Sequence, residues 1–303
     1  MARAQPGGGL LLVDKPQGMT SNQVLGRIKR LFGIKKAGHT GTLDPMATGL
    51  LVVCLGHATR IAAHLVDADK AYRARLHLGK TTDTEDAEGN LVQQRPVPSL
   101  SPSGVEAVLA EFVGELEQVP PMYSALKHQG RRLYAMAREG QVVERPPRSV
   151  RIDHLALVAW HLDDATAPGF EVAVRCSKGT YIRSLVRDIG ERLGCGAHLC
   201  QLTRTQASPF ELTAAHRLET LEQMEQTERW ACLRPINEAV PDWPAVALSP
   251  EQLVDFRQGR MVAMKAPQTM GELDWVCVFH QGVVVGLAQC VHGQLQPRAV
   301  FPL

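Results

Sequence analysis

The segment "GHTGTLDPMATGLLVVCLG" (residues 38–56) places a single aspartate between a glycine- and threonine-rich stretch and an apolar run. The apolar run predicts a buried strand, so Asp44 falls in the loop just before that strand. The alternative for an Asp-Pro step is a plain turn, in which the aspartate bonds local backbone amides. Here three glycines allow close backbone approach, and the strand would anchor the loop to rigid structure. A carboxylate held beside a core must be paired or take part in chemistry, so Asp44 is the first candidate functional residue.

The chain as a whole has the composition of an ordinary globular protein. Its 303 residues are 45% hydrophobic and 21% charged, and because single cores usually stop growing at about 250 to 300 residues, we expect a large domain and a small one. No apolar run approaches the ~20 residues of a membrane span, and the run at residues 10–13 is too short for a signal peptide. A cytoplasmic protein with no membrane partner is therefore expected. The seven cysteines are an odd number without a CxxC pair, which argues against a disulfide framework.

The apolar periodicity predicts strands and helices that are interspersed along the chain. Strands are expected near residues 10–14, 50–56, 71–79, 150–158, 170–176 and 198–206, and helices near 21–32, 57–67, 103–113 and 177–194. Because no regular βαβ period is present, the pattern favours a mixed α+β sheet. Prolines after residue 234 and Val-rich strands beyond them predict a small all-β module, and we place its boundary near residue 245.

Basic residues gather in one proline-bounded segment. From Lys127 to Arg151 there are seven positive residues against two negative ones, overlapping an insertion near residues 118–150 that reads as loop, helix and loop. A second basic cluster lies at residues 27–36, whereas acidic residues gather at 83–88 and 211–228. Such segregation is what a polyanion-binding face requires, and two solvated faces without a partner remain the alternative.

The segment "SKGTYIRS" (residues 177–184) supplies a candidate partner for Asp44. Tyr181 and Arg183 fall in the first turn of a predicted helix, where unpaired backbone amides favour anions. An arginine keeps its charge and can hold a carboxylate through two parallel hydrogen bonds. We therefore hypothesise that Arg183 pairs with Asp44 and keeps it ionised, because burial alone would raise the pKa of Asp44.

No metal or cofactor site is predicted. The 11 histidines are dispersed without an HxxxH or HExxH motif, and His39 beside the Asp44 loop is either a structural histidine or a substrate contact. Cys195 and Cys200 flank His198 in a weak metal pattern, for which buried thiols are the favoured interpretation. The sequence also lacks a phosphate-binding glycine loop and the GxSxG context of an acyl-transfer serine.

A series of segments, in order from about residue 9 to about residue 210, resembles the bacterial TruB family of tRNA pseudouridine-55 synthases. These segments are "DKPQGMTS", "GHTGTLDPMATGLLVV", "KAYRARLHLG", "TTDTEDAEG", "PPMYSALKHQGRRLYAMAREG" and "SKGTYIRSLVRDIGERLGCGAHLCQLTRTQ". The resemblance implies a mixed, mostly antiparallel sheet flanked by helices over residues 1–244, and a β-rich, PUA-like RNA-binding domain over residues 245–303. It also implies isomerisation of uridine 55 in the T loop of tRNA, without a cofactor, a metal or an obligatory protein partner.

The same resemblance implies a set of site residues: the nucleophile Asp44, the site-lining residues Tyr72 and Arg183, the substrate contacts His39, Tyr181 and Leu202, and Lys15 near the pocket. An ionised carboxylate can stabilise or trap the positive charge that cleavage of a glycosidic bond builds on the sugar. A base in a folded T loop must leave its stack to reach Asp44, so nucleotide flipping is expected, with His39 at the vacated space. Tyr72 can stack on the base or serve as an acid or base, Leu202 would form an apolar floor, and the basic insertion would grip phosphates.

Several alternatives remain open at this level. Asp44 could attack the sugar, attack the base ring or remove a sugar proton. A guide-RNA-dependent synthase of the same superfamily would need protein partners, and a non-catalytic RNA-binding module would keep only the scaffold. A nucleosidase or glycoside hydrolase would need a second carboxylate, and neither Asp14 nor Asp67 is obviously placed for that role.

Overall fold

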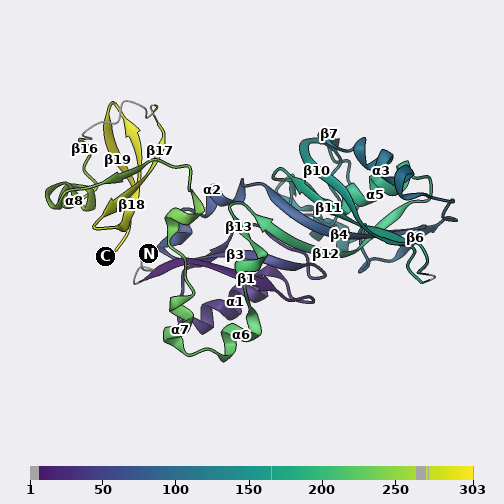
Figure 1. Cartoon of the computed structure of the whole chain (residues 1–303), viewed down its shortest axis with the longest axis horizontal. Helices are drawn as coiled ribbons and strands as arrows, with labels where there is room; N and C mark the ends of the chain where they lie inside the picture. The colour runs from purple at the N-terminus through teal and green to yellow at the C-terminus, as the bar shows by residue number, and fades with distance from the viewer. Residues whose placement is uncertain (1–6, 165, 264–270, 272, 303) are drawn as a thin grey trace.

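A computed structural model describes residues 7–164, 166–263, 271 and 273–302 of the chain. It contains a large ten-stranded sheet with helices around it and a separate five-stranded sheet near the C-terminus (Figure 1). None of the helices within the described residues is long and apolar enough to cross a membrane.

The large sheet is mixed and mostly antiparallel, as expected. Its strands are β1 (Gly8–Lys15), β2 (Ala37–His39), β3 (Thr48–Gly56), β4 (Lys70–Leu78), β7 (Gly114–Gln118), β10 (Arg148–His161), β11 (Gly169–Cys176), β12 (Ala197–Ala207), β13 (Phe210–Glu211) and β14 (His216–Arg217). They follow the order β14-β1-β3-β12-β4-β11-β10-β7, while β2 pairs with β3 and β13 with β12. Of these pairings only β1–β14 and β3–β12 are parallel among the described strands. The β3–β12–β4 centre brings the Asp44 segment next to chain that lies about 150 residues further on, at Arg204.

Helices pack against two parts of this sheet (Figure 1). They are α1 (Ser21–Leu31), α2 (Ala62–Val66), α3 (Pro102–Ala110), α4 (Leu133–Arg138), α5 (Ile182–Arg192), α6 (Leu218–Gln223) and α7 (Gln226–Ala231). α1 begins at the N-cap Thr20 in a capping box with Gln23, and its buried residues Val24 and Ile28 face one core. α5 buries Val186 and Ile189 in a second core together with strands β4, β11 and β12. The apolar periodicity of both helices is therefore explained by burial against the sheet.

Helix α5 lies unusually close to the start of β12. A Cβ added at Gly190 would lie 2.2 Å from the backbone nitrogen of Ala197, so only glycine allows this approach. The close contact fixes the height of α5 over the sheet. It thereby fixes where the first turn of α5, with Arg183, meets the strand ends.

Some short elements differ from the predictions. Residues 57–67 form a 3₁₀ turn, η1 (His57–Arg60), followed by the short helix α2, rather than one helix. The strand β7, "GELEQ", was not predicted because its single apolar residue gives no strand pattern, and it forms only by pairing with β10. Two small hairpins also depend on pairing: β5 (Lys80–Thr82) with β6 (Leu91–Gln94), and β8 (Lys127–His128) with β9 (Arg131–Arg132).

The C-terminal sheet has the order β15-β17-β18-β19-β16. Its elements are β15 (Ala245–Ala247), α8 (Pro250–Arg257), β16 (Val262–Ala263), β17 (Trp275–His280), β18 (Val283–Val291) and β19 (Gln294–Val300). The predicted module is therefore β-rich but not all-β, because Ser249 caps α8 through a capping box that the sequence reading overlooked. Cys277 and Phe301 share a core with Leu12 and Ile61, so this sheet packs directly against the large one.

Gly49 joins β3 to β12 at the edge of the Asp44 loop, where it pairs with Arg204. Its φ is +97°, and an added Cβ would lie 2.4 Å from the carbonyl oxygen of Arg204. We expect Gly49→Ala to lower the free energy of unfolding by ~2 kcal/mol or more, from steric overlap and from the left-handed backbone. Chemical denaturation measures this change.

Gly26→Ala is the matched control, because its Cβ would meet only the Arg30 side chain at 3.9 Å on the exposed side of α1. This variant should be unchanged or more stable by ~0.5–1 kcal/mol. Equal effects of the two substitutions would contradict the tight packing at Gly49.

Candidate active site

The Asp44 loop is held rigidly at both ends. The hydroxyl of Ser21 donates to the carbonyl of Leu43 (3.1 Å) and accepts from the Leu43 amide (2.8 Å). The amide of Ala47 donates to the Asp44 carbonyl at 3.1 Å and closes a turn that leads into β3. The carboxylate of Asp44 is 37% exposed, so it stands on fixed backbone with one side open.

Lys15, at the end of β1, ties the same loop to its neighbours. Its side chain is fully buried, and Nζ donates to the carbonyls of Pro16 (2.8 Å), Met19 (2.6 Å) and Pro45 (3.3 Å). Burial lowers the pKa of Lys15 to about 8, while the negative charges of Asp44 and Glu88 oppose that shift. The Lys15 ammonium therefore holds the backbone around Pro45, next to Asp44 in the chain.

The predicted ion pair between Asp44 and Arg183 is confirmed. Arg183 Nε lies 3.0 Å from Asp44 Oδ2, and the arginine side chain is only 6% exposed. The pair is not the two-bond arrangement considered above, because Nη1 donates to the carbonyl of Thr84 (3.0 Å) and Nη2 to that of Tyr123 (2.8 Å). These two carbonyls orient the guanidinium, so that its Nε edge faces Asp44.

A second carboxylate, that of Asp86, lies at the same arginine. Asp86 Oδ2 is 3.6 Å from Arg183 Nε, and its side chain is 5% exposed. Its Oδ1 accepts from Thr84 Oγ1 (2.6 Å) and from the Glu88 amide (3.0 Å). Solvated faces were one of two alternatives that the sequence left open for the acidic stretch 83–88, and the buried Asp86 does not fit that alternative. The only available signal was its place within "TTDTEDAEG", because the contact with Arg183 joins segments about 100 residues apart.

These surroundings set the proton affinity of Asp44. Burial raises the pKa of Asp44, the Arg183 guanidinium opposes the rise, and the neighbouring Asp86 carboxylate adds to it. The net direction is upward, so Arg183 offsets the effect of burial only in part. A carboxylate with a raised pKa is a stronger nucleophile and base than an ordinary aspartate once it is ionised.

Tyr72 and Arg204 form the adjoining part of the site. Arg204 was not among the site residues predicted from the sequence. Tyr72 on β4 is paired in register with Val174 of β11 on one side and with Arg204 of β12 on the other. Arg204 is 2% exposed and donates from Nε to the Leu50 carbonyl (2.7 Å) and from Nη2 to that of Gly41 (3.1 Å). Burial raises the pKa of Tyr72 although the Arg204 charge opposes it, so the phenol keeps its proton at neutral pH.

The remaining predicted residues lie around this centre. The charge of Asp44 contributes to the raised pKa of both Tyr72 and Tyr181, which places the two phenols within its electrostatic reach. Tyr181 is the N-cap of α5, where its amide donates to Gln118 Oε1 at 2.8 Å. Leu202, 7% exposed, lies on β12 two residues before Arg204.

His39 ends β2 and enters the loop that carries Asp44. Its Nδ1 is buried and has no hydrogen-bond partner within the part of the chain that the structure describes, while burial and the Arg204 charge lower the pKa of His39. A neutral imidazole offers a flat face on which a base can stack. Among the described residues, no group of three or more His, Cys, Asp or Glu side chains could hold a metal ion.

The basic insertion is partly neutralised by its own acidic neighbours. Arg131 pairs with Glu139 at 2.6 Å, and Arg151 pairs with Asp153 at 2.7 Å. Tyr123, at the start of this insertion, also supplies the carbonyl that holds Arg183. The segment is therefore connected to the site through the Tyr123 backbone.

Comparison with known protein families gives matches along almost the whole chain. The N-terminal domain of TruB family pseudouridylate synthases matches residues 29–182, and the C-terminal domain of tRNA pseudouridylate synthase B matches residues 183–241. The C-terminal domain of pseudouridine synthase II TruB matches residues 244–301.

Curated relatives agree with these family matches. The tRNA pseudouridine synthase B of Chromohalobacter salexigens is 51% identical over 247 residues, covering 82% of this chain and 79% of the relative. That of Methylobacillus flagellatus is 47% identical over 294 residues, covering 97% and 95% of the two chains.

Solved structures show the same fold. The chain aligns with a TM-score of 0.71 and 25% identity to a chain of a Cbf5-Nop10-Gar1 complex, over 97% of this chain and 85% of that one. A chain from an H/ACA RNP bound to a substrate RNA containing 2'-deoxyuridine gives the same TM-score and coverage at 24% identity.

Proposed function

This chain belongs to the TruB family of pseudouridylate synthases, and we propose that it converts uridine 55 in the T loop of tRNA to pseudouridine at the Asp44 site. The reaction is an isomerisation, in which the bond between ribose and uracil nitrogen is broken and rejoined through a ring carbon. The observation that carries the proposal is the open carboxylate of Asp44, held 3.0 Å from the buried Arg183 at the end of a rigid loop.

Asp44 is the proposed nucleophile. Cleavage of the glycosidic bond leaves positive charge on the sugar, and an ionised carboxylate at that face stabilises or traps it. The open side of Asp44 gives a nucleotide access, while Arg183 already occupies the other side, so little reorganisation is needed during reaction. Three routes stay compatible with this arrangement: attack on the sugar, attack on the ring, and removal of a sugar proton.

Tyr72 and three neighbours are proposed to hold the flipped nucleotide. A protonated phenol can stack on uracil and donate a hydrogen bond. If it gives its proton to the freed ring nitrogen, the phenolate that remains can take the proton that the ring carbon loses once that carbon is joined to the sugar. Tyr181 and Leu202 would complete the walls around the base, and His39 would contact the space that the base leaves. Lys15 supports this pocket through the carbonyl of Pro45.

We further propose a division of labour along the chain. Residues 1–244 would form the catalytic domain, and residues 245–303 a PUA-like RNA-binding domain; residues 1–6, 165, 264–270, 272 and 303 lie outside the described part. The insertion near residues 118–150 would grip phosphates of the T arm through its exposed cations, such as Lys127 and Arg148. The enzyme is expected to act in the cytoplasm.

A hydrolytic reaction is less well supported although a second carboxylate is present. Asp86 is 5% exposed; its Oδ1 accepts from Thr84 and the Glu88 amide, and its Oδ2 faces the Arg183 guanidinium at 3.6 Å. A hydrolase base needs a free oxygen beside a water site between two carboxylates. The surroundings of Asp86 instead suit the alignment of Arg183.

The test uses the purified chain alone with an unmodified T-arm stem-loop, and pseudouridine is measured directly in digested RNA. We expect conversion at position 55 without guide RNA or added protein, and none when that uridine is replaced by cytidine. Conversion only after addition of a guide RNA and partner proteins would favour the guide-dependent alternative. Release of free uracil would favour a nucleosidase.

A further inference from the structure

The first two turns of α5 present three polar side chains to the loop between β5 and β6 (residues 83–90, here the 83–90 loop). Arg183 is 6% exposed and Ser184 fully buried, while Arg187 is 27% exposed. Arg187 follows Ser184 by three positions and Arg183 by four, the spacings at which helical side chains are neighbours, so all three can reach the same loop. Arg183 binds the Thr84 carbonyl of this loop and pairs with Asp44, whereas Ser184 and Arg187 bind the Glu85 carboxylate.

The carboxylate of Glu85 is held at both oxygens. Oε2 accepts from the Ser184 hydroxyl at 2.8 Å, and Oε1 forms a short ion pair with Nη1 of Arg187. The Glu85 side chain is 12% exposed. Arg187 also contacts Asp188 Oδ1 at 2.8 Å, so its guanidinium is fixed from a second direction.

The backbone of Glu85 has an uncommon conformation. Its φ is +65°, in the left-handed region that residues with a side chain rarely adopt. Its carbonyl accepts from the Leu199 amide of β12 at 3.0 Å. The side-chain contacts with α5 and this backbone bond together provide what holds the residue in that conformation.

Both sequence neighbours of Glu85 contact Arg183. The carbonyl of Thr84 accepts from Arg183 Nη1 at 3.0 Å, and the Asp86 carboxylate lies 3.6 Å from its Nε. A rotation of the backbone at Glu85 would move both acceptors together. The orientation of the Nε edge toward Asp44 therefore depends on the backbone conformation of Glu85, whose side chain binds Ser184 and Arg187.

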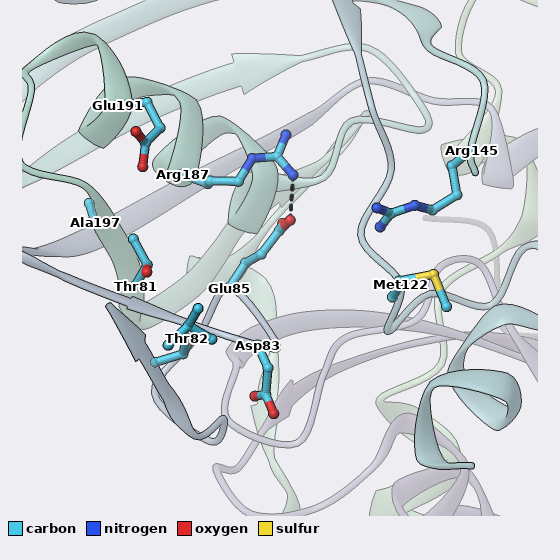
Figure 2. A pocket seen from close by; sticks show the side chains of 10 residues that line it. Thr81, Thr82, Asp83, Glu85, Met122, Arg145, Arg187, Glu191 and Ala197 are labelled. Carbon is cyan, nitrogen blue, oxygen red and sulfur yellow. Dashed lines mark hydrogen bonds and ion pairs between the residues drawn. The ribbon is translucent and has the colours of Figure 1, made fainter. Parts of the chain in front are cut away.

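Glu85 and Arg187 act from outside the proposed substrate site. Together with Arg145 they line a pocket of about 330 Å³, and the lining includes neither Asp44 nor Arg183. Figure 2 shows the Glu85 carboxylate meeting the Arg187 guanidinium there, with Arg145 on the opposite wall. The Glu85–Arg187 pair therefore supports the 83–90 loop from the side of this pocket, which Asp44 and Arg183 do not line.

We propose that Glu85, held by Ser184 and Arg187 of α5, is a positioning residue that sets the orientation of Arg183 toward Asp44. This inference rests on the proposed function, because the rate of pseudouridine formation reports on it. Loss of the contacts of Glu85 with Ser184 and Arg187 would disturb the alignment of Arg183. It would leave the proposed RNA-binding surfaces unchanged.

Two variants test whether the contacts of Glu85 with helix α5 position Arg183. Arg187→Met removes the cation at similar length, and Glu85→Gly removes the carboxylate while keeping a residue that adopts positive φ freely, so the loop can still fold. We expect both to lower the single-turnover rate ~10²-fold, the effect of a small misplacement in an active site, with tRNA affinity little changed.

The acid limb of the pH–rate profile should move to higher pH in both variants, because Arg183 then opposes the raised pKa of Asp44 less well. Arg187→Lys should restore most of the rate.

The matched control is Arg192→Met on the same helix, where an exposed pair with Glu111 is lost and no change in rate is expected. Wild-type rates in either Arg187→Met or Glu85→Gly would overturn the inference. So would a joint loss of rate and tRNA affinity without a shift of the acid limb, or failure of Arg187→Lys to recover activity. Absence of pseudouridine with the wild-type chain would instead count against the proposed function.

Discussion

Asp44→Asn should abolish pseudouridine formation while the protein still binds tRNA. The substitution keeps the size of the side chain and its place in the turn before β3, but it removes the charge and the nucleophilic oxygen. Removal of a nucleophile usually lowers the chemical rate by on the order of 10⁴-fold or more. The amide should leave tRNA affinity unchanged or slightly higher, because one negative charge near the RNA is lost.

Single-turnover assays with excess enzyme, and filter binding on the same samples, separate the two effects. Asp44→Ala serves as a second variant, because an asparagine can revert to aspartate by deamidation. Asp67→Asn is the matched control: Asp67 has a side chain that is 60% exposed and pairs with Lys178 at the surface, so normal rates are expected. A rate for Asp44→Asn within ~10-fold of wild type would rule out nucleophilic attack by this residue.

The pair of Asp44 and Arg183 could be predicted from sequence because the residues directly around each of them indicate its role. An aspartate at the entrance to a buried strand needs a partner, and an arginine at the start of an amphipathic helix is available for one. The helix α1 was equally legible, since its capping box and apolar stripe are local. The order of strands in the large sheet was not, because pairing joins distant segments.

The residues that were missed share one physical property. Asp86, Glu85 and Arg204 are charged side chains whose burial depends on contacts with segments about 100 to 160 residues away in sequence. An acidic run such as 83–88 is usually solvated, and nothing local marks which of its members is buried. Arg204 sits in a strand pattern where a polar residue would normally point to solvent, yet the Gly41 and Leu50 carbonyls receive its side chain.

Arg183→Met should lower the rate of pseudouridine formation far more than it lowers affinity for tRNA. The substitution leaves the Thr84 and Tyr123 carbonyls without their donor, and it removes the cation beside the Asp44 and Asp86 carboxylates, in a site where the arginine is 6% exposed. Breaking such a buried ionic contact costs about 3–5 kcal/mol of stability, so rates must be measured well below the unfolding temperature. Arg183→Lys should rescue little, because a single ammonium cannot reach all three positions that the planar guanidinium serves.

The pH dependence distinguishes an electrostatic role for Arg183 from loss of folding. Asp44 must be ionised to act, so the wild-type rate falls as pH drops through its raised pKa. Arg183 opposes that rise, so its removal raises the pKa of Asp44 further and moves the acid limb to higher pH. The ratio of the Arg183→Met rate to the wild-type rate should therefore increase with pH along this limb. A constant ratio would mean that Arg183 supports only the fold, and near-normal single-turnover rates would mean that Asp44 does not need its partner.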